Sequence, residues 1–346
     1  MWKELPEVPS RVKMETKRLT IDDIARELNI SKTTVSRAIS GKGRIGQETR
    51  DKVLRYIKEN NYKPSAIAKG LAQSRTFNIC FVMPGDYSIV DLPFYQGFLW
   101  GISNTASKAD YDVIISMVTE KDISQLVRLI ENQKVDGIIL GRTLEEDKAE
   151  EYLLSKEIPF VTAGSSKDAS VIQVDNDHRS ACRELTLVLL RKKMKKMALV
   201  GGNMGYIVNQ NRLAGYREAY LEFGAAIDSS LVYLNLVNEN DVDKVVDELI
   251  EKDVDCIVCM DDYICGCVLG KLRKEHVRIP EDIKVASFYN SILLENSQSV
   301  ITSLQFNVTE MAAVCCNTLL SQIDKKEVPG KTLLGYEVII RESTQA

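Results

Sequence analysis

Four polar or basic side chains recur on one side of a predicted helix in the stretch ISKTTVSRAISG. They are Lys32, Thr33, Ser36 and Arg37. Amino and guanidinium groups suit phosphates and guanine edges, while hydroxyl groups can donate to or accept from a base or a phosphate. The residue types therefore favour contact with a nucleic acid. An ordinary pair of surface helices is the alternative interpretation.

Two short helices must position that polar face. In the first helix the apolar residues recur at positions i, i+3, i+4 and i+7: Ile21, Ile24, Ala25 and Leu28. Thr20 can cap this helix with Asp23, and Asn29 can end it. Ser31 can then cap the second helix, whose inward residues are Val35, Ala38 and Ile39 and which Gly41 stops. So short a turn predicts a helix-turn-helix whose second helix enters a major groove. A third helix over roughly 47–60 closes its core.

Charge is distributed unevenly along the 346 residues. Residues 1–76 carry 17 Lys and Arg against 9 Asp and Glu, a net charge of +8. The remainder carries 28 basic against 40 acidic residues, a net charge of −12. A basic head on an acidic body predicts a head that binds polyanions.

The N-terminal stretch MWKELPEVPSRVKMETKR lacks the apolar core of a secretory signal. No apolar run is long enough to span a bilayer, so we expect a cytoplasmic protein without a membrane partner. We expect residues 1–17 to form a disordered leader, with Met14 as an alternative start. The head then covers 18–63.

Four of the eight cysteines fall close together in CIVCMDDYICGC, so a zinc site has to be considered. Cys256 and Cys259, however, lie in a run typical of a buried strand, where their odd spacing sends them to opposite faces. Cysteine is also a common small core residue. We therefore expect structural cysteines, no metal and no cofactor.

Residues 64–76 form a linker between the head and the body. Pro64 can begin a helix that runs to about Ala72, but this helix is short and contains Gly70. Helices under about 12 residues are marginal in water. We expect this segment to fold only against a surface.

From residue 77 to 346, short β-rich runs alternate with amphipathic helices. The predicted strands are 78–82, 113–117, 137–140, 159–161, 172–174, 197–200, 231–235, 256–260 and 283–288. Continuous apolar strands separated by helices predict doubly wound parallel sheets. We expect two α/β subdomains, roughly 77–175 with 306–322 and 176–304 with 330–346. A ligand would bind in the cleft at the carboxyl ends of the strands.

The chain resembles the lactose/galactose repressor (LacI/GalR) family of bacterial transcription regulators. The likeness lies in TIDDIARELNISKTTVSRAISGKGRIGQETRDKVLRYIKENNYKPSAIAKGLA and in the body segments DGIIL, IPFV, NRLAGY and IPEDIKVASF. The resemblance implies a homodimeric repressor on a pseudo-palindromic operator, with Ala68 and Leu71 of a hinge helix in the minor groove. The DNA-binding residues are then Thr20, Ser31, Lys32, Thr33, Thr34, Ser36, Arg37, Ala68 and Leu71.

The body resembles a type I periplasmic binding protein, which implies a small effector in its cleft. Arg212 in NQNRLAGY matches the effector-binding arginine of the family, and Asp262 matches a second contact. The expected effector-binding residues are Phe94, Tyr95, Arg142, Asp177, Arg212, Asp262, Tyr289 and Gln305. One departure is Phe288-Tyr289-Asn290, where sugar-responsive members carry an acidic residue. Its absence weakens the expectation of a hexose bound in the usual manner.

A transport protein and an enzyme are the two alternatives to a transcription regulator. A solute-binding protein for transport shares the body but predicts an export signal and no basic head. An enzyme is disfavoured because the sequence has two histidines, His178 and His276, no Walker loop and no Gly-x-Ser-x-Gly. No heptad repeat follows Glu342, which favours a dimer over a tetramer.

Overall fold

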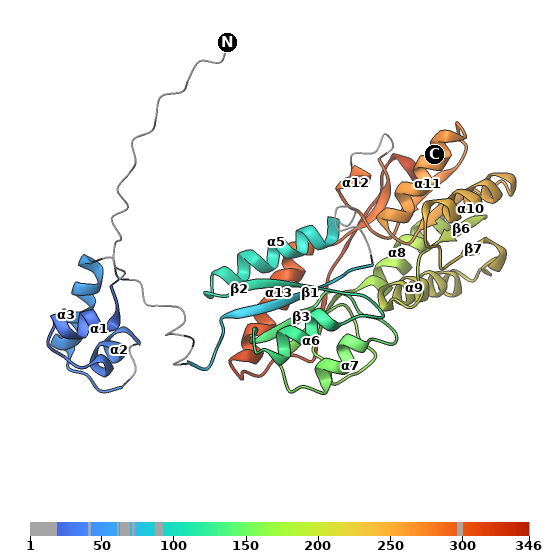
Figure 1. Cartoon of the computed structure of the whole chain (residues 1–346). Helices are drawn as coiled ribbons and strands as arrows, with labels where there is room; N and C mark the ends of the chain where they lie inside the picture. The colour runs from blue at the N-terminus through green and yellow to red at the C-terminus, as the bar shows by residue number, and fades with distance from the viewer. Residues whose placement is uncertain are drawn as a thin grey trace, which may run out of the picture. The chain divides into compact units, whose positions relative to one another are not determined.

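The computed structural model describes residues 19–40, 43–60, 62, 70, 73–86, 93–295 and 300–345. The chain forms two units, Met1–Arg75 and Thr76–Ala346 (Figure 1). The predictions for the leader, for Gly41 and for the hinge-helix residues Ala68 and Leu71 lie outside the described residues.

The first unit contains α1 (Ile21–Glu27), α2 (Lys32–Ser40) and α3 (Gln47–Glu59). Its core consists of the buried residues Ile24, Ala25, Val35, Ala38, Val53 and Tyr62. The predicted capping box is confirmed, because the Asp23 amide donates to the Thr20 hydroxyl and the Thr20 amide donates to the Asp23 carboxylate. Asn29 has a φ of 53°, a left-handed conformation that asparagine tolerates, and it turns the chain from α1 into α2. The helix-turn-helix prediction is confirmed.

The second unit contains two six-stranded sheets. The first has the order β11-β5-β4-β3-β1-β2, and all its pairs are parallel. Its strands are β1 (Asn78–Pro84), β2 (Asp112–Val118), β3 (Gly137–Leu140), β4 (Phe160–Ala163), β5 (Gln173–Asn176) and β11 (Lys331–Leu334). The second has the order β12-β10-β9-β8-β6-β7, with an antiparallel pair only at β12. Its strands are β6 (Met197–Val200), β7 (Val232–Tyr233), β8 (Cys256–Cys259), β9 (Lys284–Ser287), β10 (Thr302–Gln305) and β12 (Glu337–Ile339).

Helices cover both faces of each sheet (Figure 1). The first sheet lies between α5 (Pro93–Ser107) with α13 (Val308–Ile323) and α6 (Ser124–Glu131) with α7 (Lys148–Leu154). The second lies between α8 (His178–Arg191) with α9 (Ile207–Phe223) and α10 (Glu239–Glu251) with α11 (Asp262–Lys274). Short helices η2 (Ser229–Leu231), α12 (Ile292–Glu295) and η3 (Glu342–Thr344) complete the second subdomain. The predicted pair of doubly wound parallel sheets is confirmed.

The prediction that all of 330–346 belongs to the second subdomain is wrong for β11. Lys331 to Leu334 pair in parallel with β5 of the first sheet, and only β12 returns to the second. The physical reason is that β11 is an edge strand whose side chains alternate between exposed and half-buried, so it lacks the continuous apolar run of an interior strand. The two subdomains are therefore joined by three crossovers, after β5, β10 and β11.

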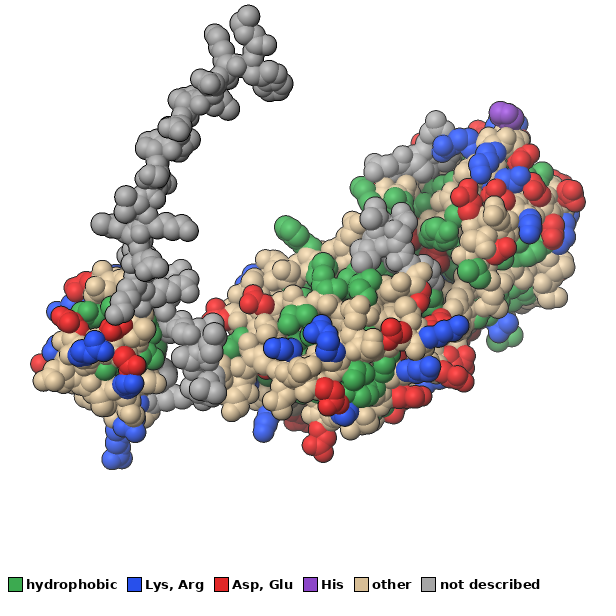
Figure 2. Space-filling view, in the orientation of Figure 1, with side chains coloured by type: hydrophobic (Ala, Val, Ile, Leu, Met, Phe, Trp, Pro, Cys, Tyr) green, Lys and Arg blue, Asp and Glu red, His purple; other side chains and the backbone are tan. Residues whose placement is uncertain are grey.

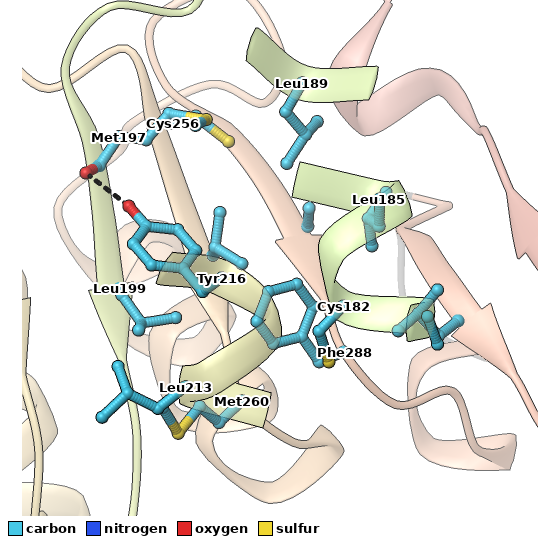
Figure 3. Close-up of a cluster of buried hydrophobic side chains, with 14 of the residues drawn as sticks. Cys182, Leu185, Leu189, Met197, Leu199, Leu213, Tyr216, Cys256, Met260 and Phe288 are labelled. Carbon is cyan, nitrogen blue, oxygen red and sulfur yellow. Dashed lines mark hydrogen bonds between the residues drawn. The ribbon is translucent and has the colours of Figure 1, made fainter. Parts of the chain in front are cut away.

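The cysteines of β8 lie on opposite faces of the second sheet, as their spacing predicts. Cys256 packs with α8 and α9, and Cys259 packs with α10 and α11. Figure 3 shows Cys256 beside Tyr216, whose hydroxyl donates to the Met197 carbonyl at 3.3 Å. The described residues contain no cluster of three His, Cys, Asp or Glu suited to a metal. Within the same residues, no helix is long and apolar enough to cross a membrane.

Candidate functional site

The polar face of α2 is open to solvent. Lys32, Thr33, Ser36 and Arg37 are all exposed. The other hydroxyls predicted to bind DNA already serve helix ends, because Thr20 caps α1 and the Ser31 hydroxyl accepts from the Thr34 amide at 3.1 Å. The Thr34 hydroxyl lies 2.8 Å from that of Ser31. The side chains of this face that are open to a ligand are therefore those of the four exposed residues.

Two contacts within the head hold the basic side chains of this face. Lys32 forms an ion pair with Asp22 of α1, with Nζ 2.5 Å from Oδ1. Arg37 packs over Gly43, where an added Cβ would lie 3.3 Å from its Cδ and Nε. Gly43 has a φ of 88°, which glycine adopts without strain. The missing side chain at Gly43 thus leaves room for the Arg37 side chain, which is exposed.

In the second unit, a buried polar cluster lies where α8, α9 and α11 begin. Arg212 of α9 is 7% exposed, and its Nη1 donates to Asn209 Oδ1 at 3.0 Å. Its Nε has no hydrogen-bond partner in the described part of the chain. Gly215, one turn further along α9, permits this placement because a Cβ there would clash with the Arg179 carbonyl of α8. The absent side chain lets the two helices approach closely.

Asp262, the first residue of α11, is 8% exposed. Its Oδ2 finds no hydrogen-bond donor within the described ranges. Burial raises the pKa of Asp262, and a hydrogen bond from the Ser291 side chain and, to a smaller extent, the positive charge of Arg212 oppose that shift. An arginine and a carboxylate that are both buried and incompletely bonded carry an energetic cost that a ligand can relieve.

His178 joins this cluster, although the sequence did not single it out as a site residue. It is the first residue of α8, buried, with its ring 4.6 Å from that of Phe306. Burial, and then the charge of Arg212, lowers its pKa well below the usual value, so the imidazole is neutral at pH 7. Its Nδ1 is buried without a partner among the residues described. The only sequence signal was its place directly after β5.

Aromatic rings form the apolar wall beside this cluster. Tyr289 stacks on Phe306, with centroids 6.2 Å apart and planes 13° from parallel. Phe94 meets Tyr289 edge-on at 6.4 Å and Tyr95 at 5.2 Å. Burial raises the pKa of both tyrosines above the usual value. Phe94, Tyr95, Tyr289 and Arg212 were predicted to share a site, and the structure brings them together. Phe306 was missed.

Three predicted effector contacts already have protein partners. Asp177 caps α8 by accepting from the Ser180 amide at 3.1 Å. Arg142 donates to Asp86 at 2.9 Å and to the Tyr206 hydroxyl at 3.2 Å. Gln305 accepts from Asn290 at 2.6 Å. The Asn290 amide also donates to Glu295 at 2.9 Å.

An open groove of about 810 Å³ lies beside the aromatic wall. Tyr289, Asn290, Gln305 and Phe306 line it, together with parts of α5, α13 and the crossover from β11 to β12. Arg212, Asp262 and His178 do not line this groove. The second unit therefore has a buried polar cluster and a separate open groove, divided by stacked aromatic rings.

Family models match both parts of the chain. Residues 20–65 match "Bacterial regulatory proteins, lacI family". Residues 76–312 match "Periplasmic binding proteins and sugar binding domain of LacI family". The first match contains α1, α2 and α3, and the second contains Arg212, Asp262 and Tyr289. A solute-binding protein for transport is not expected to carry a head of this kind, so the match at residues 20–65 argues against that alternative.

Several relatives match over nearly their whole length. Catabolite control protein A of Staphylococcus xylosus is 29% identical over 333 residues, covering 94% of this chain and 99% of that protein. The transcriptional regulator MalR of Streptococcus pneumoniae is 28% identical, covering 93% of this chain and 99% of that protein.

Solved structures of transcription regulators are also similar to this chain over nearly its whole length. The complex of the transcriptional regulator CelR with cellobiose has a TM-score of 0.71 and 26% identity, covering 94% of this chain and 100% of that one. The lac repressor dimer bound to operator and the anti-inducer ONPF has a TM-score of 0.79 at 19% identity, covering 95% and 100%. This chain belongs to the LacI family of DNA-binding bacterial transcription regulators, and it is not an enzyme.

Proposed function

We propose that this regulator is a repressor whose affinity for operator DNA is controlled by a small effector, a sugar or sugar derivative, bound beside Arg212. The observation that carries the proposal is the buried cluster of Arg212, Asp262 and His178, each with a polar atom that the described residues leave without a hydrogen bond. Buried polar atoms in native proteins are normally satisfied. A ligand between these side chains would supply the missing bonds.

The chemistry of the cluster favours hydroxyl groups. A hydroxyl both donates and accepts, so neighbouring hydroxyls can accept from Arg212 Nε and donate to Asp262 Oδ2. The flat faces of Tyr289 and Phe306 suit the apolar face of a sugar ring. The similarity to a regulator solved with cellobiose supports the same class of ligand. Tyr289 stands where sugar-responsive members of the family carry an acidic residue, so we expect a binding mode without that strong acceptor for sugar hydroxyls.

On the DNA side, we propose that Lys32, Thr33, Ser36 and Arg37 read an operator half-site. Their exposure on α2 and the match to the regulatory family model support this assignment. Thr20, Ser31 and Thr34 fit phosphate-proximal capping roles better, because their hydroxyls are bonded within the head. Ala68 and Leu71 remain predicted minor-groove contacts. Operator DNA lies on the bacterial chromosome, so we propose a cytoplasmic location for this regulator.

A homodimer completes the proposal. Trp100 of α5 is 74% exposed, and Ile292 of α12 is 57% exposed. Figure 2 shows hydrophobic side chains gathered along the side of the body where Figure 1 places these two helices. Exposed apolar surface of this kind marks an interaction site. A second copy on this face would pair two heads on a two-fold symmetric operator.

Binding of the effector would reorient the two subdomains and change the operator affinity of the dimer. The coupling required is modest, about 1–3 kcal/mol, or roughly 5–150-fold in affinity. A corepressor that tightens DNA binding would use the same residues as an inducer. The direction of the response is therefore an outcome of the experiment below.

The test starts with selection of operator fragments from genomic DNA by the purified chain at physiological salt. Operator binding is then titrated with cellobiose, maltose and other neutral sugars. We expect one of them to change the affinity, and Arg212→Ala to abolish that change while operator binding persists. Arg217→Ala is the matched control, because Arg217 is exposed on the same helix. A normal response in Arg212→Ala would place the effector elsewhere.

A further inference from the structure

The two subdomains are tied together by backbone hydrogen bonds at a point far from the three crossovers in sequence. The Glu145 amide donates to the Gly205 carbonyl at 2.8 Å, and the Ile207 amide donates to the Thr143 carbonyl at 3.3 Å. Leu144 and Tyr206 are thereby paired as an antiparallel bridge. Residues 142–145 follow β3 of the first sheet, and residues 203–210 follow β6 of the second. We call these two segments the latch.

Side chains reinforce the latch. Arg142 donates to the Tyr206 hydroxyl at 3.2 Å, and its guanidinium lies 5.1 Å from the centre of the Tyr206 ring. Asp86, in the loop after β1, anchors the same guanidinium at 2.9 Å. The Gln210 amide donates to the Glu145 carboxylate at 3.0 Å. With only 10% of its side chain exposed, Arg142 is committed to this contact.

The latch lies at the carboxyl ends of β3 and β6, on the side where a ligand enters an α/β cleft. Three covalent crossovers also join the two subdomains. Stacked Tyr289 and Phe306 line the open groove, and Arg212 is not among its lining residues. Separation of the two segments of the latch would part the subdomains at this edge of the sheets.

We propose that Arg142 and Tyr206 are positioning residues that hold the two subdomains together across the cleft, and that the effector reaches Arg212 only when the latch opens. The identity of the ligand rests on the proposed function, whereas closure itself can be measured without ligand or DNA. Arg142 then acts through the orientation of the subdomains instead of touching the effector.

Neighbouring amides separate latch opening from loss of folding. The Gly141 amide donates to the Val82 carbonyl within the first subdomain, and the Gly201 amide donates to the Tyr233 carbonyl within the second, both at 2.9 Å. These amides immediately precede the two segments of the latch but do not cross between subdomains. Opening exposes Glu145 and Ile207 while leaving Gly141 and Gly201 protected.

The experiment is amide hydrogen exchange on the full chain without ligand, resolved to single amides with overlapping peptides. In the wild type we expect slow exchange at Glu145 and Ile207. Tyr206→Ala should speed exchange at both by roughly tenfold or more, because local opening governs exchange of such amides. Exchange at Gly141 and Gly201 should not change. Arg142→Gln provides a second variant, with the same amides expected to respond.

Tyr152→Ala is the matched control. The Tyr152 hydroxyl donates to Glu131 at 2.8 Å, and Lys156 lies 5.1 Å from its ring, so it makes the same kinds of contact within the first subdomain alone. The proposal is overturned if Glu145 and Ile207 exchange at unprotected rates in the wild type, if neither latch variant changes them, or if Gly201 accelerates equally. Hydrogen exchange tests the latch, whereas operator selection tests the proposed function. Failure of one proposal therefore does not imply failure of the other.

Discussion

The polar face of α2 and the buried cluster around Arg212 use similar residue types in opposite surroundings. Lys32 and Arg37 are exposed and held only by contacts within the head, so each can approach a polyanion without losing a strong partner. Arg212 and Asp262 are buried, and one polar atom of each has no hydrogen-bond partner among the described residues. The difference teaches that exposure suits a surface that meets large and varied partners, whereas burial suits a site that waits for one small ligand.

The largest effect on stability and on operator binding is expected from a change in the core of the head, which supports the exposed face of α2. Ile24 is fully buried, and the described residues of the head contribute six buried residues to its core. Ile24→Ala should destabilise the head by about 2–5 kcal/mol. Operator binding should disappear, while thermal unfolding of the second unit, followed by calorimetry, stays unchanged. A loss of stability in both units would show that the head does not unfold separately.

Arg37→Ala tests the exposed face itself. If Arg37 reads a base, the change should weaken specific binding by about 1–3 kcal/mol and relax the preference at one operator position. Fluorescence anisotropy with the selected operator and with random DNA distinguishes the two contact types. An equal loss on both DNAs reduces Arg37 to a phosphate contact. Arg55→Ala on α3, another exposed arginine of the head, is the control for lost charge.

The sequence predicts the framework of both regions well, for a physical reason. All nine predicted strands are present because continuous apolar runs of parallel strands are local signals. β10, β11 and β12 were not predicted. For β11 the reason is that Lys331 to Leu334 form a half-exposed edge strand without such a run. The helix-turn-helix followed from local capping and periodicity, which need no knowledge of distant contacts.

The candidate site was predicted less completely, because its properties depend on distant pairs. Arg142 looked like an effector contact at the end of a strand, but Asp86 and Tyr206 engage it from 56 and 64 residues away. His178 was missed because nothing in its neighbours along the chain reveals that Arg212 and Phe306 surround it. The family resemblance supplied Arg212, but the unpartnered Nε emerges only from the fold.

Asp262→Asn tests the buried side of the comparison by pH. Burial raises the pKa of Asp262 in the folded chain, so the folded state binds this proton more tightly than the unfolded state. Stability from this group is therefore lost as pH rises from the unfolded pKa through the folded one. The variant should be more stable than the ligand-free wild type at neutral pH, by about 1 kcal/mol. The advantage should fade below the unfolded pKa.

Urea unfolding across pH measures this difference. Asp228→Asn is a control with the opposite sign, because hydrogen bonds from Ser230 lower the pKa of Asp228. That variant should lose stability relative to the wild type as pH rises. If the free energies of unfolding of Asp262→Asn and of the wild type instead run parallel against pH, the Asp262 carboxylate has a further partner in solution. Its place in the proposed effector site beside Arg212 then has to be revised.

The smallest effect on stability is expected from Asp22, an acidic residue beside the basic face of α2. Asp22 pairs with Lys32 at 2.5 Å, with both side chains largely exposed. Exposed ion pairs contribute only about 0.2–1 kcal/mol, so Asp22→Asn should barely change the stability of the head. It should, however, free Lys32 and remove a negative charge facing DNA, which strengthens binding to operator and random DNA alike and steepens the dependence on salt. Asp51→Asn on α3, where the carboxylate accepts from Gln47, controls for net charge. Equal gains in both variants would assign the effect to net charge, whereas a gain confined to Asp22→Asn identifies Lys32 as a DNA contact restrained by its neighbour.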